Sequence, residues 1–260
     1  MRARDVLSTT VLALAVTTAA SAEVKTRVVD YEQDGTPLQG LIAWNDAHAG
    51  KRPGVLIVHE WWGHNDHARH QARRLAEAGY VAFALDMYGK GKVATLPDDA
   101  MKFMAEATKD PAVVKARFAA ALALLKADPH VDATQIAAIG YCFGGGVVLN
   151  MAAAGEDLAA VVSFHGALSA VGPVPPGLKP RVLVLTGAAD PMVPPDQGNA
   201  FKQKMTAAGA KYEVVEYPGA MHSFTNPDAD KAGMPQLAYN ADADKASFAA
   251  MLALFKQVFH

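Results

Sequence analysis

Short apolar runs alternate with amphipathic stretches from residue 24 to the end of the chain. Runs that are apolar throughout are typical of strands buried on both faces of a parallel sheet. The pattern predicts such strands at 55–58, 80–85, 136–139, 159–164 and 182–186, and a further strand at 211–217. Two earlier strands, 24–31 and 38–44, are separated by the turn signal Asp34-Gly35 and are expected to run antiparallel.

Helices are predicted after most of the buried strands, because apolar residues recur there at helical spacing. The predicted helices cover 67–78, 111–127, 147–154, 196–208 and 242–258. Alternation of strands and helices favours a mostly parallel sheet with helices on both faces, which is an α/β fold. No segment with the composition of a linker divides residues 23–260, so we expect one domain there.

The first 22 residues differ from the rest of the chain. Arg2 and Arg4 precede an apolar run at 6–16, and Ala20-Ser21-Ala22 follows it. A short basic segment, an apolar run too short to span a bilayer and a small-x-small tripeptide are typical of a secretory signal peptide. We therefore expect residues 1–22 to be removed and the mature protein to be periplasmic or secreted. The alternative is an uncleaved membrane anchor.

Composition narrows the classes of partner. The 260-residue chain is 51% hydrophobic and 19% charged, which is enough to build a core, and its formal net charge is -2. This charge gives no reason to expect a nucleic acid or an anionic membrane as partner. We expect a monomer that acts on a small molecule and has no membrane contact after signal cleavage. With one cysteine, Cys142, the chain forms no intramolecular disulfide.

The cysteine lies in a motif that indicates a nucleophile. Residues 140–144 read Gly-Tyr-Cys-Phe-Gly, which is G-x-S-x-G with cysteine in place of serine. This motif places its nucleophile on a strained turn between a strand and a helix, and both elements are predicted here. The helix N-terminus favours a thiolate. The alternative is an inert buried cysteine. The serines at 163, 169, 223 and 247 all lack the flanking glycines.

A base and an orienting acid are predicted from the order in which polar residues follow the later strands. His222 follows the strand at 211–217, and Asp190 follows the strand at 182–186. Nucleophile, acid and base in this chain order are typical of the α/β-hydrolase arrangement. The alternatives are the C-terminal His260 as the base and Asp196 as the acid. Asp196 is expected instead to cap the following helix.

Five sequence segments together resemble those of the dienelactone hydrolase family, whose members are cysteine-dependent enzymes of the α/β-hydrolase superfamily. They are His59-Glu60-Trp61-Trp62-Gly63, Asp86-Met87-Tyr88-Gly89, Gly140–Gly145, Gly187–Pro194 and His222-Ser223-Phe224. The resemblance covers the chain after residue 22. It implies the α/β-hydrolase fold, with antiparallel strands at the N-terminus, and cofactor-independent hydrolysis of a small ester or lactone through an acyl-enzyme.

The resemblance also implies residue roles. Cys142 corresponds to the nucleophile, His222 to the base and Asp190 to the acid that orients it. Glu60 corresponds to the glutamate that holds the resting thiol; the alternative is a loop carboxylate paired with an arginine. The backbone N–H groups of Phe143 and Trp61 correspond to the oxyanion hole.

The residues expected to line the substrate pocket are Trp62, Tyr88, Phe224 and Asn226. Dienelactone hydrolases proper carry an arginine at the position of Asn226, four residues after the catalytic histidine. A neutral amide does not replace a charged guanidinium, which argues against dienelactone itself as the substrate. The alternatives left open are a thioesterase or peptidase on the same fold, and a non-catalytic small-molecule binding protein.

A cluster of histidines does not fit a known metal motif. The spacing from His59 to His64 is one residue longer than H-E-x-x-H requires, and it spans a predicted strand end. His67 and His70 share a helix face but have no further ligand beside them in the sequence. We expect neither a metal nor a cofactor.

Overall fold

The computed structural model describes residues 23–260, so the predicted signal peptide lies outside the described residues and stays a prediction. The described chain contains an eight-stranded sheet in the order β1-β2-β4-β3-β5-β6-β7-β8. The strands are β1 (Val24–Gln33), β2 (Thr36–Asn45), β3 (Arg52–Val58), β4 (Val81–Ala84), β5 (Val131–Tyr141), β6 (Ala160–Phe164), β7 (Arg181–Gly187) and β8 (Tyr212–Tyr217). The helices are α1 (Asp66–Glu77), α2 (Pro97–Thr108), α3 (Pro111–Ala127), α4 (Phe143–Ala153), α5 (Pro195–Ala207) and α6 (Ala241–Val258), with short 3-10 helices η1 (Leu168–Ala170) and η2 (Ala229–Ala232).

Strand direction follows the predicted pattern. β1 pairs with β2 and β2 with β4 in antiparallel register, whereas β3 to β8 pair in parallel. The predicted fold class, a mostly parallel sheet with antiparallel strands at the N-terminus, is confirmed. In a parallel sheet, ligands bind outside the carboxyl ends of the strands. The predicted site residues follow β3, β5, β7 and β8, so this edge is where they can meet.

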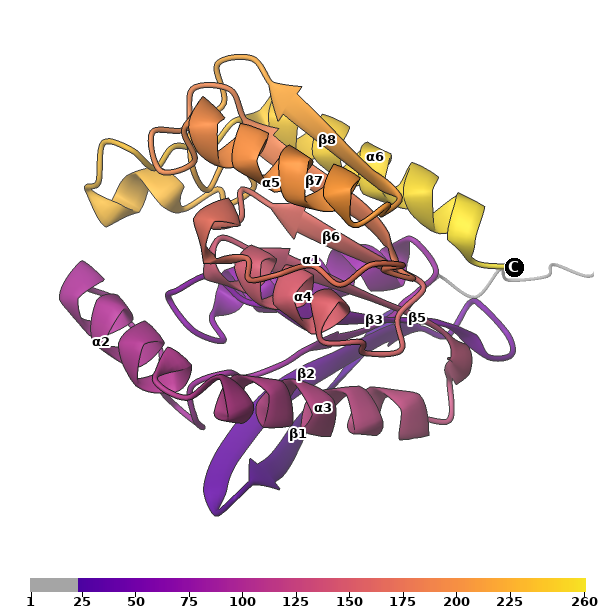
Figure 1. Cartoon of the computed structure of the whole chain (residues 1–260). Helices are drawn as coiled ribbons and strands as arrows, with labels where there is room; N and C mark the ends of the chain where they lie inside the picture. Colours follow the sequence, from indigo (N-terminus) through magenta and orange to yellow (C-terminus); the bar gives the residue numbers. More distant parts are fainter. Residues whose placement is uncertain (1–22) are drawn as a thin grey trace, which may run out of the picture.

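The core lies on both faces of the sheet because residues that alternate along each strand point to opposite faces. On β3, Leu56 and Val58 belong to one buried cluster, and Val55 and Ile57 belong to the other. Helices α3, α4 and α5 cover the first face, and α1 and α6 cover the second (Figure 1). Burial on both faces explains why the central strands read as continuous apolar runs.

Two local predictions differ from the structure. Helix α2 was not predicted separately, because it buries only Ala100 and Ala107 and so has almost no apolar stripe. The prediction that Asp196 caps the next helix is wrong: Pro194 occupies the N-cap of α5, and Asp196 lies in its first turn. No helix between residues 23 and 260 is both long and apolar enough to cross a bilayer.

Candidate active site

The turn between β5 and α4 holds Cys142 in a backbone conformation that side chains rarely adopt. Its φ is 51° and its ψ is -114°. The glycines two positions away are needed for space: a Cβ on Gly140 would lie 2.0 Å from the carbonyl oxygen of Gly144, and one on Gly144 would lie 2.3 Å from that of Val58. The strained turn therefore depends on both glycines of the motif, as such a nucleophile-bearing turn requires.

The structure brings Asp190 and His222 together although 32 residues separate them in the chain. Nδ1 of His222 lies 2.7 Å from Oδ2 of Asp190, and both side chains are buried. The other oxygen of Asp190 accepts a hydrogen bond from the Met192 N–H at 2.8 Å, which fixes the carboxylate. Since a carboxylate only accepts, Nδ1 of His222 carries the proton that is shared with Asp190.

The other ring nitrogen of His222 is free for chemistry. Among the described residues, Nε2 is buried and has no hydrogen-bond partner. Burial alone would disfavour the imidazolium, but the negative charge of the Cys142 thiolate and the hydrogen bond to Asp190 outweigh it and raise the pKa of His222 to about 10. A cysteine beside a histidine that a carboxylate orients is the arrangement that an activated nucleophile and its base require.

Removing the thiol should lower the pKa of His222. In the Cys142→Ala variant the thiolate charge disappears while the burial that disfavours the imidazolium remains, so the pKa moves down from about 10. The measurement is an NMR pH titration of the His222 ring carbons and protons in both proteins, with the signal assigned through a His222→Gln variant. A pKa that is the same in both proteins would show that Cys142 does not act on His222.

Glu60 is fully buried at the end of β3, and both of its oxygens are occupied. Oε1 accepts a hydrogen bond from the Ser223 hydroxyl at 2.7 Å, and Oε2 accepts one from the Asn226 amide at 2.7 Å. Nδ1 of His67 lies 3.6 Å from Oε2. The hydrogen bonds of this carboxylate thus go to neutral groups rather than to an arginine or to Cys142. The role of Glu60 as the resting partner of the thiol stays a prediction.

The loop after β3 is fixed by side chains whose role the sequence did not indicate. The Met87 N–H donates to Nε2 of His59, which leaves the proton on Nδ1, and Nδ1 donates to the Glu60 carbonyl at 2.5 Å. The Tyr88 hydroxyl donates to the Trp61 carbonyl at 3.1 Å. The hydrogen bonds from His59 and from Tyr88 hold the segment that carries Glu60 and the Trp61 N–H.

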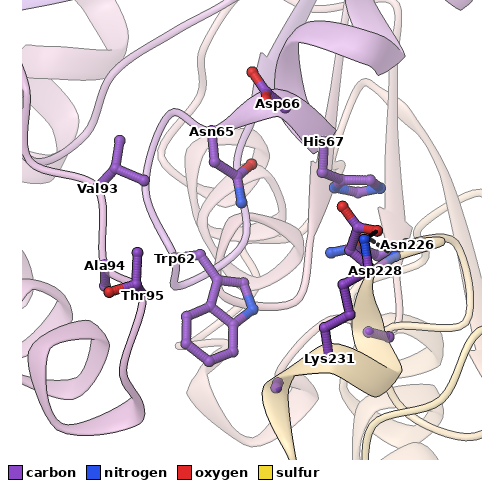
Figure 2. Close-up of a pocket in the computed structure, with 12 residues that line it drawn as sticks. Trp62, Asn65, Asp66, His67, Val93, Ala94, Thr95, Asn226, Asp228 and Lys231 are labelled. Carbon is purple, nitrogen blue, oxygen red and sulfur yellow. Dashed lines mark hydrogen bonds and ion pairs between the residues drawn. The ribbon is translucent and has the colours of Figure 1, made fainter.

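A polar cavity of about 330 Å³ is lined by His67 and Asn226, two of the residues that lie against Glu60 (Figure 2). Of the four residues predicted to line a substrate pocket, Trp62 and Asn226 line this cavity. Tyr88 and Phe224 do not: both are buried, with Tyr88 packed on His59 and Phe224 edge-on to His165. The role of these two residues in a substrate pocket stays a prediction.

His165 is a second buried histidine beside the pair of His222 and Asp190. It follows β6, its Nε2 lies 2.8 Å from the Thr225 hydroxyl, and its ring centroid lies 5.2 Å from that of His222. Burial, and next the positive charge of His222, hold the pKa of His165 well below its usual value, so the ring is neutral. The position of His165 directly after a predicted strand could have indicated a place near the site, but no sequence motif distinguished it from the other histidines.

No group of three or more His, Cys, Asp or Glu side chains in residues 23–260 is arranged to hold a metal ion. His59, counted in the histidine cluster, is instead committed to backbone hydrogen bonds at both ring nitrogens.

Comparison with known proteins gives one consistent family. The model of the dienelactone hydrolase family matches residues 38–259. The solved structure named m3DLH is 38% identical with a TM-score of 0.85, and the match covers 91% of this chain and 99% of that chain. A dienelactone hydrolase-like promiscuous phosphotriesterase from metagenomic libraries is 37% identical, with the same TM-score of 0.85 and the same coverage of 91% and 99%.

Two relatives known from their sequences also match more than two thirds of this chain. A putative carboxymethylenebutenolidase of Methylorubrum extorquens is 33% identical over 189 residues, covering 68% of this chain and 65% of the relative. Protein usf of Aquifex pyrophilus is 29% identical over 223 residues, covering 83% of this chain and 94% of the relative. An α/β-hydrolase from a deep-sea metagenome, 19% identical with a TM-score of 0.67 over 90% of this chain and 98% of its own, shares the fold.

Proposed function

Because this chain belongs to the dienelactone hydrolase family and is a carboxylic ester or lactone hydrolase, we propose that it cleaves its substrate through a covalent acyl-enzyme on Cys142. His222 is the base and acid of the reaction, and Asp190 orients it. The observation that carries this proposal is the buried pair of His222 and Asp190 at 2.7 Å, whose imidazole lies close enough to Cys142 for the charge of the thiolate to raise its pKa.

In the first half-reaction, Sγ of Cys142 attacks the carbonyl carbon and a C–S bond forms. The carbonyl oxygen becomes an oxyanion and accepts hydrogen bonds from the N–H groups of Phe143 and Trp61. Phe143 begins α4, so its N–H has no acceptor within the helix. When the C–O bond of the ester breaks, the departing alkoxide takes the proton from Nε2 of His222.

In the second half-reaction, Nε2 of His222 removes a proton from water as the oxygen adds to the acyl carbon. The C–S bond then breaks, the carboxylic acid leaves, and the thiolate returns beside the imidazolium. The charge that raises the pKa of His222 is therefore restored at the end of each cycle.

The substrate of this reaction is a neutral ester or lactone. Glu60 supplies a buried carboxylate beside the polar cavity, and its hydrogen-bond donors, Ser223 and Asn226, are neutral. A substrate that carries its own carboxylate would bring a like charge to this region without a guanidinium to pair with it. A neutral thioester would react by the same steps, and parallel assays of a matched ester and thioester distinguish the two substrate classes.

The experiment is to trap the acyl-enzyme. We expect p-nitrophenyl butyrate to release a burst of one p-nitrophenolate per enzyme, and acid-quenched protein to carry one butyryl group on the peptide that contains Cys142. The unreacted protein and a His222→Gln variant serve as controls, since loss of the base slows both acylation and deacylation. An adduct on another residue would disprove the assigned nucleophile, and steady turnover without any adduct would disprove the covalent route.

A further inference from the structure

A second cavity, of about 750 Å³, lies between the α2–α3 segment and α4; we call it the α3–α4 cavity. One face of α4 forms its first wall through Phe143, Val147 and Met151, which are spaced four residues apart. Met104 of α2 and Val114 of α3 belong to the opposite wall. This volume falls within the range of small-molecule sites, about 300–1,000 Å³.

Of the three polar side chains at this cavity, Asn150 and Thr108 have their hydrogen bonds satisfied within the protein, whereas Lys115 is exposed and its Nζ lies 4.0 Å from Oε1 of Glu156. Asn150 donates to the carbonyl oxygens of Gly146 and Ala170 and accepts from the Gly172 N–H at 2.9 Å. The Thr108 hydroxyl donates to the Met104 carbonyl at 2.8 Å. The remaining surface of the cavity is almost all apolar, so the cavity suits a guest that brings no polar groups of its own.

The α3–α4 cavity reaches the backbone of the nucleophile. Phe143 follows Cys142 in the chain, and the N–H of Ala167 donates to the Cys142 carbonyl at 3.3 Å; both residues line the cavity. The polar cavity lies on the other side, at Trp62 and Asn226. An ester bound at Cys142 therefore has an apolar space beside it as well as a polar one.

Sheet order indicates which part of the ester faces the apolar space. His222 follows β8 at one edge of the sheet, whereas α3 packs against β3 and β5 in the middle of the sheet and against β4 and β1 on the side away from β8. The alcohol must leave toward Nε2 of His222, which protonates it. The acyl chain, bonded to Cys142 throughout the acyl-enzyme stage, then extends away from His222 toward α3.

We infer that the α3–α4 cavity binds the acyl chain, and that the substrates are neutral esters of medium-length aliphatic acids. This inference rests on the proposed function. Moving one methylene of the acyl chain from water into an apolar site raises kcat/KM by at most about fourfold. Several buried methylenes therefore give a strong preference for longer chains.

The first test compares p-nitrophenyl acetate with the octanoate. We expect the octanoate to have a kcat/KM roughly 30-fold or more above that of the acetate, since part of its six additional methylenes is buried.

The second test fills the cavity and uses a matched control. Ala112 lines the cavity from the exposed start of α3, and Ala105 is equally exposed on α2 but does not line it. In Ala112→Trp, kcat/KM for the octanoate should fall by about tenfold or more while that for the acetate changes less than about twofold. Ala105→Trp should leave both substrates unchanged. Ala170→Trp, from the wall near η1, should repeat the effect of Ala112→Trp.

The outcomes separate the two proposals. If the acetate is turned over through Cys142 but the octanoate is no better, or if Ala112→Trp and Ala170→Trp slow both esters equally, the inference about the cavity is overturned and the proposed function stands. If neither ester is hydrolysed, both are overturned.

Discussion

Replacing Cys142 with alanine is expected to lower kcat/KM for p-nitrophenyl butyrate by about four orders of magnitude or more, as for loss of other enzyme nucleophiles. The methyl group of alanine cannot form the C–S bond, so hydrolysis then depends on water and on the oxyanion donors alone. His222 cannot compensate, because its task in the cycle is proton transfer. The measurement is steady-state hydrolysis with enough protein to detect a residual rate above that of buffer.

The control for this variant must show that the site is otherwise intact. Cys142 is only 8% exposed and its carbonyl accepts from the Gly145 N–H at 3.0 Å, a hydrogen bond that alanine retains. Circular dichroism and thermal unfolding should therefore match the wild type within a few degrees. Retention of more than a tenth of the activity in a folded Cys142→Ala protein would show that another residue is the nucleophile.

The sequence could predict that Asp190 and His222 meet because the signal of each is local. Asp190 and His222 each follow an apolar run that could be recognised as a strand, and parallel strands bring their carboxyl ends to one edge. The 2.7 Å contact between them needs only the correct strand order, which the fold supplies. The same holds for Gly140 and Gly144, whose spacing defines the turn.

The partners of Glu60 could not be predicted in this way. Its hydrogen bonds to Ser223 and Asn226 depend on the path of the loop after β8, where Ser223 has a φ of 56° and the Asn226 N–H turns back to the Ser223 carbonyl at 2.9 Å. The spacing of apolar residues along the chain does not determine the path of this loop. Phe224 illustrates the same limit, since an aromatic residue next to a catalytic histidine can equally be a pocket wall or, as here, part of the core.

The α3–α4 cavity was missed for a related reason. The α3–α4 cavity depends on how α2 meets α3, and α2 carries too few buried residues to be predicted as a separate helix. Figure 1 shows α2 at one edge of the molecule, beyond the start of α3. The size of a space between helices depends on small residues along its walls, such as Gly146 and Ala170, and a sequence pattern does not show which small residues will face such a space.

The second large effect is expected from Gly144→Ala, which should lower the free energy of unfolding by about 3 kcal/mol or more. The added Cβ would lie 2.3 Å from the Val58 carbonyl oxygen and 2.6 Å from the His59 carbonyl oxygen. Both are backbone atoms of the central strand and its following loop, so neither can move as a flexible side chain would. The start of α4 must then shift away from β3. Urea unfolding followed by circular dichroism measures the loss.

Gly146→Ala is the matched control, because it adds the same methyl group two residues further along the same helix. Its Cβ would lie 3.3 Å from the nearest atom, the Ala167 carbonyl oxygen, which a small shift relieves. Alanine also favours the helix over glycine by about 1 kcal/mol, so the net change in unfolding free energy should stay within about 1 kcal/mol of zero. Equal losses in both variants would mean that helix packing in general, rather than the approach of α4 to β3, limits stability. A loss confined to Gly144→Ala would assign the cost to the contact that positions Cys142 and the Phe143 N–H.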